Sequence, residues 1–532
     1  MANKSLFKSS GRSKSPKATD FTAVNLAGGR AYKLSDEAAL AQLAMTGCFG
    51  STYYADAEYQ LTEIKKLVAT VSPTVLAKIA VYSRESGFMK DSSAFLLAVL
   101  FATDTKLFKQ VFPRVCDNGK MLRNFCQIVR SGQTGRKSFG TVGKTAVQNW
   151  LNERTDAQLF NDSVGNDPSL SDVIKMVHPK APSKEREAFY AYLIGKDNAK
   201  YNTERLPKVV KDFETFKSSS KDNRLVPEKA NFQMYTALDL SDNEWKKLSS
   251  YMGWQATRMN LNTMQRHNVF SDPNMVDLVV KKLSNAEEIK RAKVFPYQLL
   301  AAYLQTTDVP ARVRNALQDA LEVATTNVPS IKGKVYIAVD CSGSMSAPVT
   351  GARAVASKIS CNQVASLIAA SFLRTCEDVE VIKFDTAANI ISLNARDSVM
   401  TNTQKIGTHG GGTDCASPLA LLNSRSMKGD TVIILSDNES WCQSAAYNNR
   451  ATALQNEWIK FKNRNRGAKL VCVDLAANTT TQAATTNTDT LCVGGFSENV
   501  FDVIAAFLST KETTASTSNF WLDKINQEIT LQ

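Results

Sequence analysis

The chain has 532 residues, 43% of them hydrophobic, a formal net charge of +13 and a sequence pI near 9.1. This length predicts two or three domains, and the hydrophobic content excludes a disordered protein. The charge suggests a polyanionic partner such as nucleic acid or an anionic membrane surface, although an ordinary basic surface explains charge alone at least as well.

The pattern of cysteines and the lack of long apolar runs indicate where in the cell the protein is located. None of the ten cysteines forms a CxxC pair, and with only three histidines a structural zinc site is not expected. The N-terminus lacks the apolar core of a signal peptide, and no stretch approaches the ~18 apolar residues of a membrane span. We expect a cytoplasmic protein with reduced thiols and no membrane anchor.

The first part of the chain divides into an arm and a helical domain. Residues 1–30 carry lysines and arginines among serines, which predicts a flexible basic arm that either touches RNA or has no role. Over 31–330, apolar residues recur at three- and four-residue spacing, as in Leu61, Ile64 and Leu67. Short loops between these helices predict an all-α, HEAT-like repeat domain.

Basic residues of this helical domain fall into three clusters, each of which is a candidate RNA-binding surface. Phosphate contacts from several such side chains would give salt-dependent affinity with little sequence specificity. For any one cluster, a solvated basic face is the simpler interpretation, and three clusters together favour RNA. The candidate RNA-binding residues are Lys120, Arg123, Arg130, Arg136, Lys137, Lys144, Lys175, His178, Lys180, Arg258, Arg266 and His267.

One segment of the helical domain nearly matches a phosphate-binding loop. The stretch SFGTVGKT (138–145) has Ser138 where the motif requires its first glycine. No apolar strand precedes it, although a P-loop needs a strand, a loop and a helix in that order. ATP binding is therefore not expected there.

Residues 331–510 predict an α/β, Rossmann-like domain, followed by a C-terminal tail (511–532) for which no structure is predicted. Apolar strands such as VYIAVD (335–340) alternate with helices such as NVFDVIAAFLS (499–509). This alternation is typical of a parallel sheet covered on both faces. Ligands of such sheets bind at the carboxyl ends of the strands.

Oxygen-bearing side chains gather at these predicted strand ends. The predicted ligands of a divalent metal ion, most simply Mg²⁺, are Asp340, Ser342, Ser344, Thr413 and Asp437. Alternate residues after a strand project the same way, so one carboxylate and two hydroxyls can face one point. Mg²⁺ takes six oxygens in near-octahedral geometry and keeps several waters. His409 has no nucleophile partner in the sequence, so no catalytic residue is predicted.

The metal motif resembles the metal-ion-dependent adhesion site (MIDAS) of von Willebrand factor A domains. In that family one coordination position is left for an acidic group of a partner, so the resemblance implies an open position here. The DxSxS motif alone is weakly specific. Its order before GGGTD (410–414) and a strand-borne Asp437 is much more specific. An A fold with an empty, degenerate site is the alternative.

The two halves together resemble the Ro autoantigen family, whose members carry a TROVE module. The matching segments are CFG (48–50) with TYY (52–54), GKTA (143–146) with Trp150, LSDV (170–173) with HPK (178–180), PYQLL (296–300), GGTDCASPL (411–419) and SDNES (436–440). The similarity covers about residues 35–510. A bacterial member is expected because the helical half diverges from the vertebrate pattern.

This resemblance implies a ring of helical repeats closed by the A domain. It further implies binding of small noncoding Y RNA on the outer basic surface and of single-stranded 3′ ends of misfolded or unprocessed RNA in the ring. A 3′-to-5′ exoribonuclease bridged by RNA is the implied protein partner, in RNA quality control or rRNA processing. One departure is that residues 160–169 are acidic and polar where the family is basic.

A non-catalytic, monomeric RNA-binding scaffold is therefore the leading hypothesis. The alternative is a metal-dependent adhesion module that binds an acidic protein, although such modules are usually secreted and disulfide-bonded. A nuclease is the third option, but two-metal cleavage requires clustered carboxylates around paired ions.

Overall fold

The computed structural model describes residues 19–531 with several gaps. The undescribed residues within this span are 48, 222–223, 229–230, 293, 295, 326–327, 351–358, 408–409, 443–449, 477, 498 and 511–518. Residues 1–18 of the predicted arm, and residues 511–518 and 532 of the predicted tail, therefore lie outside the described residues, as does His409.

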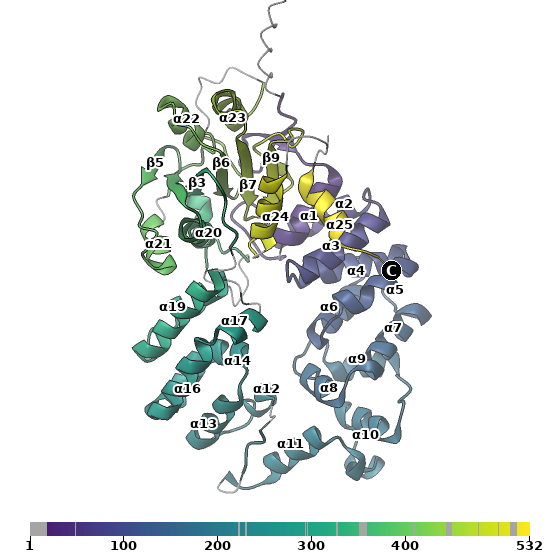
Figure 1. The fold of residues 1–532 in the computed structure, drawn as a ribbon. Coiled ribbons are helices and arrows are strands. Elements are labelled where there is room, and N and C mark those ends of the chain that lie inside the picture. The colour runs from purple at the N-terminus through teal and green to yellow at the C-terminus, as the bar shows by residue number, and fades with distance from the viewer. Residues whose placement is uncertain are drawn as a thin grey trace, which may run out of the picture.

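The helical half forms a ring that the sheet domain closes. Figure 1 shows the helices leaving the sheet domain along one arm, crossing at α11 and returning along a second arm. The predicted HEAT-like ring is thus confirmed. Its helices are α2 (Ala57–Val68), α3 (Pro73–Glu85), α4 (Asp91–Thr103), α5 (Thr105–Val115), α6 (Gly119–Ser131), α7 (Gly140–Glu153), α8 (Asp156–Asp162), α9 (Leu170–Val177), α10 (Lys184–Leu193), α11 (Lys208–Ser218), α12 (Phe232–Tyr235), α13 (Asp242–Tyr251), α14 (Trp254–Met259), α15 (Leu261–Arg266), α16 (Pro273–Leu283), α17 (Ala286–Ala292), α18 (Pro296–Gln305) and α19 (Ala311–Thr325).

Local sequence signals explain where these helices begin. The Ser72 side chain caps α3 by accepting from the backbone N–H of Val75, and Pro73 follows at the first helical position. Asp104 and Asn118 cap α5 and α6 in the same way. Helix α4 is buried along most of its length, which explains its almost unbroken apolar sequence.

The second half is a six-stranded sheet in the order β5-β4-β3-β6-β7-β9, parallel except for β5 at one edge. The α/β prediction is confirmed. Strand β5 and helices α21 and α23 were not predicted, because their sequences are short or largely polar. The elements are β3 (Lys334–Asp340), α20 (Cys361–Thr375), β4 (Asp378–Phe384), β5 (Ala388–Ile391), α21 (Val399–Ile406), α22 (Ser417–Ser424), β6 (Thr431–Ser436), α23 (Ala453–Arg464), β7 (Lys469–Asp474), β8 (Thr480–Thr481), β9 (Thr490–Gly494) and α24 (Asn499–Ser509).

The described part of the N-terminal arm is ordered against the sheet domain. Strand β1 (Ala23–Val24) pairs with β2 (Arg30–Lys33), which pairs in turn with β8. Helix α1 (Asp36–Thr46) packs against β9, and its Gln42 side chain donates to Asp474 at the end of β7. The described chain therefore runs first along the sheet domain and enters the helical arm only after α1.

Both faces of the sheet are covered, and one face shares its core with the helical half. Buried residues of β3, α20 and α24 belong to the same continuous apolar cluster as those of α3, α4 and α6. A second cluster on the opposite face joins the strands to α22 and α23. None of the described helices is long and apolar enough to cross a lipid bilayer.

Candidate metal centre and basic helical surface

Asp340 lies at the carboxyl end of β3 and is fully buried. One carboxylate oxygen accepts the backbone N–H of Ser342 at 2.9 Å, and the other accepts the hydroxyl of Ser436 at 2.6 Å. Ser436 ends the neighbouring parallel strand β6, so the two strand ends meet at this point. Asn362 of α20 fixes the turn by donating to the Asp340 carbonyl at 3.0 Å.

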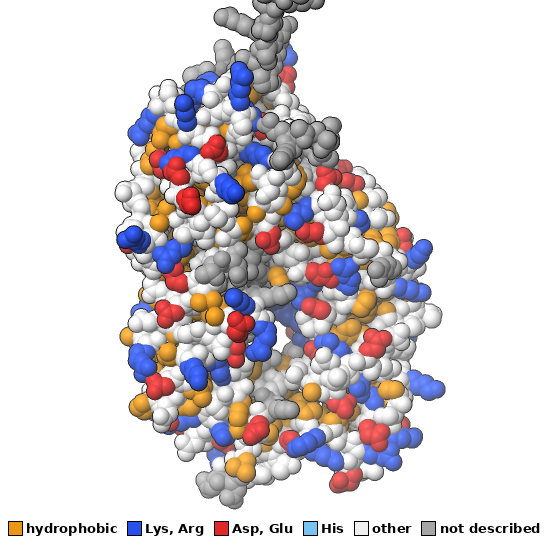
Figure 2. All heavy atoms as spheres, viewed as in Figure 1, with side chains coloured by type: hydrophobic (Ala, Val, Ile, Leu, Met, Phe, Trp, Pro, Cys, Tyr) orange, Lys and Arg blue, Asp and Glu red, His pale blue; other side chains and the backbone are white. Residues whose placement is uncertain are grey.

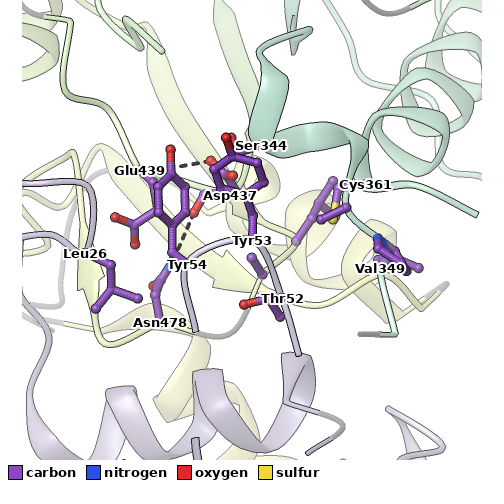
Figure 3. A pocket seen from close by; sticks show the side chains of 14 residues that line it. Leu26, Thr52, Tyr53, Tyr54, Ser344, Val349, Cys361, Asp437, Glu439 and Asn478 are labelled. Atoms are coloured by element: carbon purple, nitrogen blue, oxygen red, sulfur yellow. Dashed lines mark hydrogen bonds between the residues drawn. The ribbon is translucent and has the colours of Figure 1, made fainter. Parts of the chain in front are cut away.

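The two serines of the DxSxS motif face the same side. Their hydroxyl oxygens lie 3.3 Å apart, and both residues are buried. Figure 3 shows Ser344 beside Asp437, whose carboxylate also takes part in a hydrogen bond with the Ser344 side chain. The alternation expected from the spacing therefore brings these hydroxyls and a second strand's carboxylate together.

The glycine-rich loop that carries Thr413 is tied to both strand ends. Gly343 donates to the Gly411 carbonyl at 3.1 Å, and Gly410 donates to the Cys341 carbonyl at 3.0 Å. The Thr413 carbonyl accepts the N–H groups of Trp441 and Cys442 at 3.0 Å each. All five predicted ligands thus belong to loops bonded to one another at one edge of the sheet. We call these five residues the candidate metal site.

Burial makes the carboxyl groups of this region weak acids. Burial and the nearby charge of Asp437 raise the pKa of Asp340 to about 7. Burial also raises the pKa of Asp437 above its ordinary value. For Glu439, burial and then Asp437 raise the pKa to about 8. The Asp437 carboxyl therefore lies near both Asp340 and Glu439, and its charge disfavours ionisation of each of them.

These acids have no cationic partner among the described residues, since no lysine or arginine there forms an ion pair with Asp340, Asp437 or Glu439. Oε1 of Glu439 is buried without a hydrogen-bond partner. Buried charge of one sign is costly unless a counter-ion compensates it. Because no three His, Cys, Asp or Glu side chains cluster as a ready-made site in the described chain, the serine and threonine hydroxyls would be essential ligands. Such an all-oxygen donor set fits Mg²⁺.

Two residues that the sequence did not single out as site residues also lie here. Tyr54, from the loop between α1 and α2, forms a hydrogen bond with the Ser344 side chain (Figure 3). Glu439 follows Asp437 and is only 2% exposed. Both lie in the TYY and SDNES segments, but nothing in either segment indicates that they meet across nearly 400 residues.

Several of the predicted RNA-binding residues are exposed on three helices, of which α9 packs against both α6 and α7. Arg130 lies at the end of α6 and Lys144 on α7, while Lys175, His178 and Lys180 lie on or just after α9. We call these five residues the α6–α9 basic surface.

Specific contacts hold these three helices in place. Gln148 on α7 donates to the carbonyls of Val177 and His178 at 2.6 and 3.3 Å. Asn152, one turn later, donates to the Lys180 carbonyl at 3.1 Å. Arg130 and Lys175 both act electrostatically on Asp172, so they lie near each other across the α6–α9 contact.

Other predicted RNA-binding residues make contacts within the protein. Arg123 is 9% exposed, and its guanidinium donates to the Asp162 carbonyl at 2.5 Å, which corrects the prediction that it lies on an RNA-binding surface. Arg258 is half-buried and donates to the Gln298 carbonyl at 2.9 Å. The Arg136 guanidinium lies over the Phe101 ring and donates a hydrogen bond to the Phe101 carbonyl.

The remaining predicted residues are divided between the two arms of the helical half. Lys120 and Lys137 are exposed on the first arm, whereas Arg266 is exposed on α15 of the second arm, and His267 stacks on Trp245 at 4.2 Å. Figure 2 shows lysine and arginine side chains scattered among acidic ones on this face, with some in the recess between the two arms. The segment SFGTVGKT leads into α7 with no strand before it, in agreement with the rejection of a P-loop.

Two family models match the chain. The model described as the Ro60 vWA domain matches residues 334–508, and the model described as the TROVE domain matches residues 236–364. The first match covers the whole described sheet from β3 to α24. The second covers the returning helical arm and the start of the sheet domain.

Named relatives and a solved structure agree with these matches. The chain is 25% identical to the RNA-binding protein RO60 of Deinococcus radiodurans, over 91% of this chain and 94% of that protein. It is 27% identical to the RNA-binding protein RO60 of Caenorhabditis elegans over 32% of this chain and 28% of that one. The crystal structure of the D. radiodurans RO (RSR) protein has the same fold, with a TM-score of 0.61 and 22% identity, and covers 89% of this chain and 99% of its own.

Proposed function

Since this chain belongs to the Ro family of TROVE-domain proteins, we propose that it is a non-catalytic RNA-binding protein whose α6–α9 basic surface holds structured RNA. The observation that carries the proposal is the convergence of five exposed basic or imidazole side chains on three packed helices. Such a surface contacts phosphates and reads RNA mainly by shape.

We further propose which RNAs are bound. Small noncoding Y-type RNA would occupy the α6–α9 basic surface, and single-stranded 3′ ends of misfolded or precursor RNA would enter the ring. The recess between the arms, with its lysine and arginine side chains, supports the second site (Figure 2). A 3′-to-5′ exoribonuclease linked through the bound RNA would then mature or degrade that RNA.

The candidate metal site has a separate part in this proposal. Asp340, Ser342, Ser344, Thr413 and Asp437 would hold Mg²⁺, whose charge would compensate the buried acids of the sheet domain. The site supplies two carboxylates among hydroxyls rather than the carboxylate cluster of a two-metal nuclease. RNA incubated with the pure protein and Mg²⁺ is therefore expected to be recovered intact.

Binding of a small hairpin RNA with a single-stranded 3′ tail tests the RNA proposal. The paired variant Arg130→Ala/Lys175→Ala should bind it roughly 10-fold more weakly than the unchanged protein near physiological salt. It should also lose about two units of the slope of log affinity against log salt, because each phosphate contact contributes about one. Fluorescence anisotropy over a salt series measures both quantities.

A matched control is Arg466→Ala, which removes an exposed arginine from the loop between α23 and β7, far from the basic surface. Its affinity should equal that of the unchanged protein. Equal affinity for the hairpin RNA and for duplex DNA, or an unchanged salt slope in the paired variant, would contradict the proposal.

The alternative function is metal-dependent adhesion to an acidic protein. The observation that favours it is that all five residues of the MIDAS-like motif are present and joined at one edge of the sheet. A partner captured in pull-downs that survives ribonuclease treatment but is lost in Asp340→Ala would support this alternative. Loss of captured partners on ribonuclease treatment would support the RNA proposal.

A further inference from the structure

The side of the candidate metal site away from the sheet is covered by the helical half. A cavity of about 20 Å³, the size of roughly one water molecule, lies between them. Figure 3 shows the side chains that line it, with the Tyr54 ring beside Glu439 and close to Asp437 and Ser344. Tyr53 and Tyr54 come from the loop that connects α1 to α2, where the chain leaves the sheet domain.

The loop that carries Tyr54 is held in a defined conformation. Thr52 and Ala55 close a turn through a backbone hydrogen bond of 2.7 Å and a hydroxyl–carbonyl bond of 3.0 Å. Asp56 then caps α2 by accepting the N–H of Tyr59 at 2.7 Å. Because Tyr54 lies within this turn and shortly before the cap, its backbone is held beside the cavity.

The acidic groups that face this cavity have no positively charged partner among the residues that the structure describes. Tyr54 forms a hydrogen bond with the Ser344 side chain. The carboxyl groups of Asp437 and Glu439 lie close enough to act electrostatically on the Tyr54 phenol. Glu439 is 2% exposed, and its Oε2 accepts from the Ala27 N–H at 3.1 Å, whereas Oε1 has no hydrogen-bond partner in the part of the chain that the structure describes. An unbonded, buried carboxylate oxygen close to the Asp437 carboxyl indicates that a cation belongs here.

We propose that Tyr54 closes the open coordination side of the metal site, so that a bound divalent cation clasps the α1–α2 loop to the sheet domain. This inference rests on the proposed metal site. The phenol oxygen of Tyr54 would stand where the MIDAS resemblance leaves room for a partner's acidic group. The metal site would thus connect the sheet domain to the first loop of the helical half.

Metal titration of the full chain tests this proposal, with Mn²⁺ as the probe and bound Mn²⁺ measured by electron paramagnetic resonance. Tyr54→Phe removes only the hydroxyl and should weaken Mn²⁺ binding roughly threefold to tenfold, as expected for one lost oxygen contact. The matched control Tyr53→Phe alters the neighbouring, 59% exposed ring and should bind as the unchanged protein does.

Hydrogen exchange supplies a readout of the loop itself. Adding Mg²⁺ should slow amide exchange in residues 49–56 of the unchanged protein, and it should have no such effect in Asp340→Ala. An unchanged protein that binds no Mn²⁺ would overturn both the metal site and the clasp. Normal Mn²⁺ binding by Tyr54→Phe, or Mg²⁺ binding without added protection of the loop, would overturn the clasp alone.

Discussion

Asp340 is buried where strands β3 and β6 end side by side, and its two carboxylate oxygens are bonded to Ser342 and Ser436. The DxSxS spacing predicted that Asp340 would face two hydroxyls, because alternate residues leaving a strand point the same way. It could not predict the bond to Ser436, because that contact depends on strands β3 and β6 being neighbours. Nor could it reveal Glu439 as a third buried acid, since burial depends on which chain segments cover the loop.

This burial predicts a pH-dependent effect of metal on stability. The folded pKa of Asp340, about 7, is higher than the value of about 3.9 in an unfolded chain. In the metal-free protein, the stability that Asp340 gains from its raised pKa is therefore fully present below about pH 4. This stability is lost as the pH rises towards 7. Glu439, whose pKa is about 8, extends the same loss to higher pH. Mg²⁺ binds the ionised form, so its stabilising effect should grow over this range.

Differential scanning calorimetry with and without Mg²⁺ at pH 6 and pH 8 measures this effect. At 100 times the dissociation constant, the metal should add about 2.7 kcal/mol to the free energy of unfolding. The shift in melting temperature should be larger at pH 8 than at pH 6, and Asp340→Asn should remove it at both values. A larger shift at pH 6 would contradict the assignment of these acids to a metal site.

The secondary-structure elements divide into those that sequence patterns reveal and those that they do not. Strands β3, β6 and β7 are continuous apolar runs because helices cover both faces of the sheet, so they could be predicted. Helix α25 (Phe520–Glu528) could not be placed, since its role depends on a distant surface. It packs against α3, whose Tyr82 hydroxyl accepts from the Trp521 indole at 3.3 Å.

Helix α25 therefore packs against the first helices of the helical half and holds the C-terminal residues there. Trp521 is 2% exposed, and Arg114 of α5 donates to the Thr530 carbonyl at 2.9 Å just after the helix. Trp521→Ala should lower the free energy of unfolding by about 3–5 kcal/mol, because it leaves a cavity against Tyr82. Chemical denaturation measures the loss. Gln527→Ala, on the exposed side of α25, should change stability by less than about 0.5 kcal/mol.

At the scale of the whole molecule, the sheet domain holds both ends of the helical ring. At one end, β2 pairs with β8 and α1 packs on β9. At the other end, Glu322 and Gln318 of α19 bond to the start of α21. The sequence predicted two domains from the change in pattern near residue 331. It could not show that they share one apolar cluster, because periodicity carries no information about which distant faces meet.

A shared core and two fastened ends predict that both halves unfold together. The Glu322 carboxylate accepts the Val399 N–H at 2.7 Å across the second joint. Glu322→Gln weakens this charge-assisted bond and should lower stability by about 1–3 kcal/mol. Hydrogen exchange along a denaturant series should show equal midpoints for α4 and β6, both shifted to lower denaturant in the variant. Asp319→Asn, an exposed acid one turn earlier, should leave both midpoints in place. If α4 kept its midpoint while β6 lost stability, the two halves would be independent units, and closure of the ring would not stabilise its arms.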